Sequence, residues 1–182
     1  MYYIVSALKA EAQAFVDRYK LKKYKKESLV YFKNDLLCLV ISGVGVENAS
    51  FAVEQLCKYF PIAQEDIFLN VGICGASKKY DIGALINIDK IIYHKDEFEL
   101  SHPVISTLHC VDVEISHNIY DIVDMESYGF YKSCLIHNIK NVYVLKIVSD
   151  HFEPSMVTKE KTKMLVFKNI DTINNTILKK VL

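Results

Sequence analysis

Three acidic side chains stand where carboxylates could carry out acid–base chemistry. Glu11 follows the first predicted strand, in the first turns of a helix, where it could act as a general base or simply complement the helix dipole. Glu126, beside Met125, could accept hydrogen bonds from a ligand's hydroxyls, or it could cap the helix that opens there. Asp150 follows an apolar strand, either as a positioned acid or as the N-cap of a following turn.

Two glycine-containing segments could bring the backbone close to a ligand. Residues 42–45 (Ser-Gly-Val-Gly) lie between a predicted strand and a helix, where free amides can hold an anion or a hydroxyl. Residues 70–76 (Asn-Val-Gly-Ile-Cys-Gly-Ala) follow a buried strand. Both could equally be tight turns, and neither matches a phosphate loop or a dinucleotide fingerprint. We expect Cys74 to be a small packed side chain, because no partnered base is evident.

These residues lie between strands that alternate with helices. Hydrophobic periodicity predicts strands at 2–6, 28–32, 36–42, 66–71, 84–93, about 106–113 and 142–148, and helices at 7–20, about 49–60, 124–137 and from about 158, the last with Val166, Ile170, Ile173, Ile177 and Val181 on one face. The alternation predicts a single α/β domain over residues 1–182, with a central mixed, twisted sheet flanked by helices.

Ligands of such sheets bind beyond the carboxyl ends of the strands. This rule selects residues 7–11, 42–45, 72–76, 93–96 and 149–150 as the expected rim of a site. Glu11 and Asp150 both fall within these segments.

Composition excludes several classes of protein. The chain has 182 residues, 51% of them hydrophobic, and its 22 Lys+Arg balance 22 Asp+Glu, so nothing in its net charge attracts nucleic acid or anionic membranes. The five cysteines form no CxxC pair and the six histidines show no metal-ligand spacing. The apolar runs are too short for a signal peptide or a membrane span. We expect a cytoplasmic protein that uses no cofactor and binds neither nucleic acid nor membrane.

Taken in order, several segments resemble the nucleoside phosphorylase/nucleosidase superfamily of the purine nucleoside phosphorylase type. The closest likeness is to bacterial 5′-methylthioadenosine/S-adenosylhomocysteine nucleosidases. The matching segments are 6–11 (SALKAE), 42–45 (SGVG), 70–76 (NVGICGA), 80–85 (YDIGAL), 93–96 (YHKD), 124–127 (DMES) and 148–150 (VSD). They run almost from end to end of the chain, except for about 98–122.

The resemblance implies cleavage of the N-glycosidic bond of a purine nucleoside. By that likeness Asp150 protonates or hydrogen-bonds the purine N7, Glu126 binds the ribose hydroxyls with Met125 against the sugar, and Glu11 activates the attacking water. An acid that works at neutral pH needs to be withdrawn from water, which we expect of Asp150. The implied substrate-binding set also includes Gly43, Gly72, Ile73 and Ser149. A homodimer is expected from the family.

Water is favoured over phosphate as the nucleophile. Phosphate sites usually use arginine, but Arg18 is the only arginine and is expected to face outward. Asn70 stands where related phosphorylases place an arginine. Lysine could substitute, so a phosphate-dependent phosphorylase remains an alternative.

The chain also departs from the pattern of its relatives. Ile73 replaces their usual serine, and the segment between Tyr93 and Asp124, which normally includes the residue that stacks on the purine, is shorter. Phe98, His109 and Val113 are the candidates for that stacking role. These departures keep a second alternative open, a non-catalytic nucleoside-binding member of the family.

Overall fold

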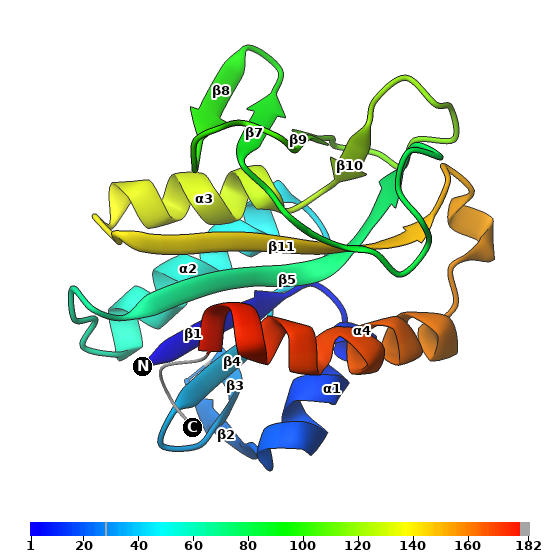
Figure 1. Ribbon diagram of the computed structural model, residues 1–182. Coiled ribbons are helices and arrows are strands. Elements are labelled where there is room, and N and C mark those ends of the chain that lie inside the picture. Colours follow the sequence, from blue (N-terminus) through cyan, green and yellow to red (C-terminus); the bar gives the residue numbers. More distant parts are fainter. Residues whose placement is uncertain (28, 179–182) are drawn as a thin grey trace.

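The computed structural model describes residues 1–27 and 29–178 as one α/β domain on a mixed, eleven-stranded sheet (Figure 1). The strands are β1 Tyr2–Ser6, β2 Lys22–Lys26, β3 Leu29–Lys33, β4 Leu37–Ile41, β5 Ile67–Ala76, β6 Leu85–Asn87, β7 Lys90–Tyr93, β8 Asp96–Glu99, β9 Thr107–Cys110, β10 Ile122–Asp124 and β11 Asn141–Asp150. The helices are α1 Lys9–Tyr19, α2 Val46–Tyr59, α3 Ser127–Ile136 and α4 Lys159–Ile173, with short helical turns at Pro154–Met156 and Asn174–Leu178.

Strand β5 organises the sheet. It pairs in parallel with β1 on one side and with β11 on the other, and β1 continues to β4. At its carboxyl end β5 also pairs with β10, through Gly75 and Ala76, and β10 leads on to β9, β7 and β8. At Gly75, β5 pairs with β11 through Asp150 and with β10 through Val123, so this end of β5 connects the two parts of the sheet.

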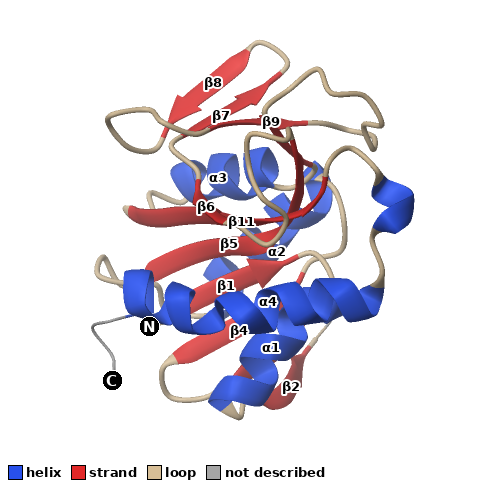
Figure 2. Ribbon diagram, turned by 45° about the vertical axis from the view of Figure 1, so that its right-hand side comes forward, coloured by secondary structure: helices blue, strands red, loops and turns tan. Residues whose placement is uncertain are grey.

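Helices cover both faces of the sheet. Helices α1 and α4 contact each other on one face, and α2 and α3 contact each other on the opposite face (Figure 2). Helix α2 shows why this layer forms, because its apolar residues recur on one side and are buried there: Ala49, Ala52, Val53 and Leu56. Each face thus has its own hydrophobic cluster, and the sheet lies between them.

Most of the expected elements are confirmed. The first strand, the hairpin around residues 33–35 and the helices near 9–19, 46–59 and 159–173 lie where periodicity predicts them. The sheet contains both parallel and antiparallel strand pairs, and helices pack on it, which confirms the predicted mixed α/β sheet flanked by helices. Parts of two expected elements, Ser28 of the strand at 28–32 and the end of the last helix with Val181, lie outside the described residues.

Three expectations about strands are wrong. Strand β5 does not end at Val71 but continues through Gly72 and Gly75, because both neighbours pair with it across the glycines. The single strand expected at 84–93 is two strands, β6 and β7, which pair with different partners. Asp124 ends strand β10 rather than opening a helix.

Two further features bear on the composition-based expectations. All five cysteines have free thiols. Among residues 1–27 and 29–178, no helix combines the length and the apolar character needed to cross a bilayer.

The two helices of one layer meet at a glycine. A Cβ at Gly129 of α3 would lie 1.9 Å from the backbone oxygen of Val46, at the start of α2. Only a hydrogen atom fits there, and backbone cannot move aside as a flexible side chain can. The α2–α3 contact therefore depends on this glycine.

We expect Gly129→Ala to lower the free energy of unfolding by about 3 kcal/mol or more, because the added methyl group forces the two helices apart. Denaturant-induced unfolding of the purified protein measures this. The matched control is Ser133→Ala in the same interface, which removes only the 3.3 Å hydrogen bond from the Ser133 hydroxyl to the Ser50 carbonyl and costs about 1 kcal/mol. Equal losses in the two variants would contradict the packing argument.

Candidate active site

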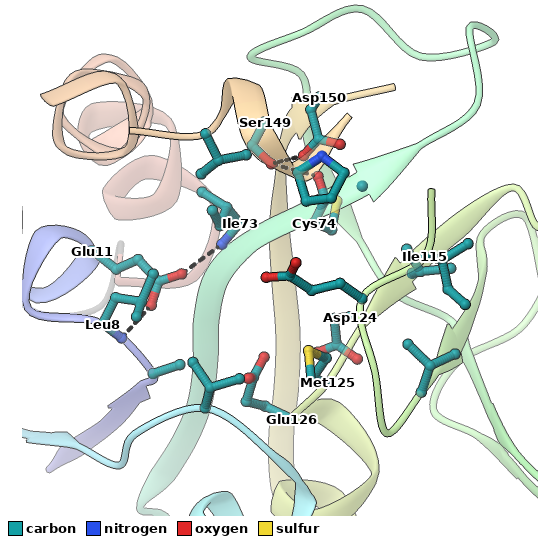
Figure 3. A pocket seen from close by; sticks show the side chains of 18 residues that line it. Leu8, Glu11, Ile73, Cys74, Ile115, Asp124, Met125, Glu126, Ser149 and Asp150 are labelled. Atoms are coloured by element: carbon teal, nitrogen blue, oxygen red, sulfur yellow. Dashed lines mark hydrogen bonds between the residues drawn. The ribbon is translucent and has the colours of Figure 1, made fainter. Parts of the chain in front are cut away.

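A cavity of about 260 Å³ opens at the carboxyl ends of β1, β5 and β11 (Figure 3). The segments that follow β1 and β4 and the loop between β9 and β10 complete its wall. The lining residues are Ala7, Leu8, Glu11, Val44, Ile73, Cys74, Gly75, Val111, Glu114, Ile115, Val123, Asp124, Met125, Glu126, Ser149, Asp150, Pro154 and Val157. The cavity lies at strand ends, where the strand-end rule places ligands of α/β sheets.

Glu11 is held by two backbone amides from different elements. Its side chain is 2% exposed; Oε2 accepts a hydrogen bond from the Leu8 amide (2.8 Å) and Oε1 accepts one from the Ile73 amide (2.9 Å). The first bond caps α1 and the second ties the helix to β5. Burial raises the pKa of Glu11, and the two amides act against this rise. Each carboxylate oxygen keeps a lone pair with which to accept a further proton donor.

Gly72 leaves space for the Glu11 carboxylate, and the buried Lys146 supplies a positive charge near it. A Cβ at Gly72 would lie 2.8 Å from Glu11 Oε1, so the carboxylate occupies the space that a side chain on β5 would take. The residue paired with Gly72 on β11 is Lys146, which is only 1% exposed. Its ammonium group lies 2.7 Å from Asp124 Oδ2. Burial acts to lower the pKa of Lys146, but the charges of Asp124, Glu126 and Glu11 outweigh it and raise the pKa.

The same ion pair fixes the segment that carries Met125 and Glu126. Asp124 Oδ2 accepts a hydrogen bond from the Ser127 amide (2.9 Å), and Oδ1 accepts one from the Ser127 hydroxyl (2.7 Å). The two residues between these anchors are thus held at the cavity wall. Glu126 Oε1 accepts a hydrogen bond from the Gly45 amide (3.1 Å), at a residue whose φ of +109° favours glycine.

Glu126 has a strongly shifted proton affinity. Its side chain is buried, and this burial, followed by the charge of Asp124, raises the pKa of Glu126 to about 7, against the action of Lys146 and the Gly45 amide. A carboxyl group with such a pKa can hold or release a proton near neutral pH. It can therefore serve as an acceptor for ligand hydroxyls when it is ionised.

Asp150 reaches the cavity through an irregularity in β11. Val148 pairs with Cys74 and Asp150 pairs with Gly75, so Ser149 is an extra residue in the ladder, a β-bulge. The bulge lets both Ser149 and Asp150 line the cavity. Asp150 is 7% exposed, so it is withdrawn from water as expected; Oδ2 accepts from the Ser149 hydroxyl (2.6 Å) and Oδ1 from the Glu153 amide (2.8 Å).

The structure gathers most of the residues that the sequence singled out. The expected residues that line the cavity are Glu11, Ile73, Met125, Glu126, Ser149 and Asp150. Gly43 and Gly72 do not line it: Gly72 lies behind the Glu11 carboxylate, and Gly45, not Gly43, contacts Glu126. The segment 93–96 also lies away from the cavity. Arg18 faces outward as expected, 3.0 Å from Asp171 at the surface.

The candidates for stacking on a base are placed elsewhere. Phe98 packs against Tyr131, His109 stacks on Tyr120, and Val113 is 67% exposed. The loop between β9 and β10 instead contributes Val111, Glu114 and Ile115 to the cavity. Sequence reasoning missed Glu114 because this loop has no periodicity to follow. It also missed Lys146, whose one signal was a charge inside an apolar strand.

Comparisons with known proteins agree with this geometry. A family model described as the Phosphorylase superfamily matches residues 2–110. No curated protein matches the chain. Among similar solved structures is the 5′-methylthioadenosine/S-adenosylhomocysteine nucleosidase from S. pneumoniae, with a transition-state inhibitor (18% identity, TM-score 0.79, covering 94% of this chain and 96% of that one).

Two further similar structures come from Helicobacter pylori. One is a 5′-methylthioadenosine/S-adenosylhomocysteine nucleosidase with butyl-thio-DADMe-Immucillin-A (13% identity, TM-score 0.83) and the other is a futalosine hydrolase (13% identity, TM-score 0.82). Each alignment covers 98% of this chain and 97% of the other. At such identities the likeness establishes the fold, and the match of the family model confirms the resemblance found in the sequence at the level of the superfamily.

The buried ion pair gives a first prediction for this site. We expect Lys146→Met to lower the free energy of unfolding by about 3–5 kcal/mol, because it leaves the Asp124 carboxylate buried without its cation. The double variant Lys146→Met/Asp124→Asn removes both charges and should recover part of that loss. Denaturant unfolding of the two single variants and the double variant gives the coupling energy. Strictly additive losses would show that the pair is not coupled.

The raised pKa of Glu126 leads to a prediction about how stability depends on pH. An unfolded glutamate releases its proton near pH 4.5, whereas folded Glu126 keeps its proton up to about pH 7. Between these values the folded state binds more protons, so stability falls as pH rises. We expect Glu126→Gln to remove this contribution, about 1.4 kcal/mol per pH unit within the window. Unfolding measured from pH 4 to 8 tests it, with Glu160→Gln on the exposed start of α4 as control. An unchanged slope in Glu126→Gln would refute the assignment.

Proposed function

The chain belongs to the phosphorylase superfamily, and from this membership we propose that it hydrolyses the N-glycosidic bond of an adenine nucleoside such as 5′-methylthioadenosine or S-adenosylhomocysteine. The observation that carries the proposal is that Glu11, Glu126 and Asp150, far apart in the sequence, line one cavity. Similar folds in the methylthioadenosine/S-adenosylhomocysteine nucleosidases add support.

In the proposed mechanism the three carboxyl groups act on different parts of the nucleoside. Asp150 gives or shares a proton with the purine N7, which makes the base a better leaving group. Glu126, in its ionised form, accepts hydrogen bonds from the ribose hydroxyls, while Met125 packs against the sugar. Ser149, which donates to Asp150, and Ile73 complete the proposed wall around the substrate, with Gly43 before α2 and Gly72 in β5 supporting that wall from behind.

Glu11 is the proposed general base. Departure of the base leaves a sugar with cationic character, and Glu11 takes a proton from the water that adds to the anomeric carbon. Burial raises the pKa of Glu11, which makes its carboxylate a stronger base than one in water. The bonds from the Leu8 and Ile73 amides hold it in position and leave one lone pair on each oxygen for the water.

The charges around the cavity support water rather than phosphate as the nucleophile. Within the described part of the chain, no lysine or arginine lines the cavity. Lys146 lies beneath it, already paired with Asp124, and Arg18 is paired with Asp171 at the surface. A phosphate dianion would therefore meet several carboxylates without a free cation to balance its charge.

Three wider proposals accompany this function. The family's domain is assigned to residues 1–182, beyond the matched 2–110, with support from the near-complete structural alignments. The free cysteines support a cytoplasmic location. A homodimer is supported by exposed apolar side chains on α2 and α3, namely Phe51, Leu135 and Ile136.

The test is release of adenine from 5′-methylthioadenosine and from S-adenosylhomocysteine, with and without phosphate. We expect release at the same rate in both conditions. Asp150→Asn and Glu11→Gln should each slow it by about 10²–10⁴-fold, the usual contribution of a positioned acid or base, while the control Glu160→Gln leaves it unchanged. Release only with phosphate would indicate a phosphorylase. Stabilisation of folded protein by the nucleosides without turnover would indicate a binding protein.

A further inference from the structure

One carboxylate of the cavity has no task in the proposed mechanism and no partner in the structure. Glu114 lines the cavity from the loop between β9 and β10. The other four lining acids are all engaged: Glu11 by the Leu8 and Ile73 amides, Asp124 by Lys146 and Ser127, Glu126 by the Gly45 amide, and Asp150 by Ser149 and the Glu153 amide. Glu114 is exposed, and within residues 1–27 and 29–178 no protein group donates a hydrogen bond to it or forms an ion pair with it, so water solvates its carboxylate in the free protein.

The loop that carries Glu114 belongs to the end of the cavity that holds Asp150. A Cβ at Gly75 would lie 3.2 Å from Val123 Cγ2 and 3.7 Å from Asp150 Oδ1, so these two side chains flank the same glycine. The loop begins beside β10, where the Val111 amide donates a hydrogen bond to the Asp124 carbonyl (2.8 Å). Figure 3 shows Ile115, the neighbour of Glu114, across the cavity from Glu11. This is the end at which the base lies in the proposed mechanism.

A ligand that fills this end removes water from Glu114. The apolar neighbours Val111, Ile115 and Val123 offer the carboxylate no compensating hydrogen bond. An ionised carboxylate only accepts hydrogen bonds, so it is destabilised by burial unless the ligand brings a donor to it. An exocyclic amino group is such a donor, whereas a carbonyl oxygen at the same position is a second acceptor and is repelled by the carboxylate.

Resting on the proposed function, we propose that Glu114 is a specificity-determining residue: it accepts a hydrogen bond from the amino group of the base and thereby selects 6-aminopurine nucleosides over 6-oxopurine nucleosides. The cavity thus discriminates at the base through a residue that does not take part in bond cleavage. A site built around such an acceptor can reject the wrong partner strongly, because a mismatched ligand leaves a buried polar group unpaired.

The experiment compares adenosine with inosine, which differ at the 6-position and the adjacent ring nitrogen. The ratio of kcat/KM for adenosine to that for inosine is measured for the natural protein and for Glu114→Gln. We expect a ratio of about 100 or more in the natural protein. Because an amide can also donate to a 6-oxo group, Glu114→Gln should reduce the ratio at least about tenfold, with inosine gaining as adenosine loses.

The matched control is Asp112→Asn, which removes a charge from the same loop. Asp112 lies outside the cavity lining, where it accepts a hydrogen bond from the Tyr93 hydroxyl (2.8 Å). The proposal predicts that this variant keeps the adenosine-to-inosine ratio of the natural protein. A ratio that is unchanged in Glu114→Gln, or that falls equally in Asp112→Asn, overturns it.

Binding separates this inference from the proposed function. The dissociation constants of adenosine and inosine, measured by calorimetry, should give the same order of preference and the same response to Glu114→Gln even if neither nucleoside is cleaved. Absence of cleavage with that binding pattern would refute hydrolysis and support the role of Glu114. Cleavage without any preference at the 6-position would support hydrolysis and refute the role of Glu114.

Discussion

The site depends on one buried cation. Four carboxyl groups, those of Glu11, Asp124, Glu126 and Asp150, are withdrawn from water around one cavity, where like charges repel, and burial raises the pKa of Glu11 and of Glu126. The ammonium group of Lys146 lies beneath them, paired with Asp124 at 2.7 Å and acting on Glu126 and Glu11 through its charge. Without it, the Asp124 carboxylate would be a buried charge with no cation to compensate it.

The sheet is arranged so that this cation can reach its partners. Lys146 pairs in register with Gly72, and the missing side chain of that glycine is the space that the Glu11 carboxylate fills. Farther along the same pair of strands, the bulge at Ser149 turns Asp150 into the cavity, at Gly75, where β5 pairs with both β11 and β10. A lysine, a glycine and a bulge on two adjacent strands therefore set the positions of acids that come from distant parts of the chain.

Much of this arrangement was predictable from the sequence, because strand ends are where α/β sheets bind ligands. Apolar runs ending at Ser6 and Val148 placed Glu11 and Asp150 at one edge of the sheet. The partner of Lys146 was not predictable, since the ion pair joins strands whose contact arises from tertiary packing alone. The predicted end of β5 at Val71 was wrong for a related reason. Pairing with neighbouring strands keeps Gly72 and Gly75 extended, although glycines often mark turns.

The environments of the three proposed catalytic and binding acids explain how similar side chains can have different tasks. Glu11 accepts one amide hydrogen bond on each oxygen, which supports its ionised form and so suits a base. Glu126 is buried, lies near the charge of Asp124 and has a single amide donor, so its pKa is raised to about 7. Asp150 is bonded to a hydroxyl group, which can donate to an ionised carboxyl or accept from a protonated one. The Glu153 amide donates to the other oxygen, Oδ1, so the oxygen that faces Ser149 can hold a proton or lose it while the backbone contact stays in place, which is what an acid that gives up its proton during each turnover requires.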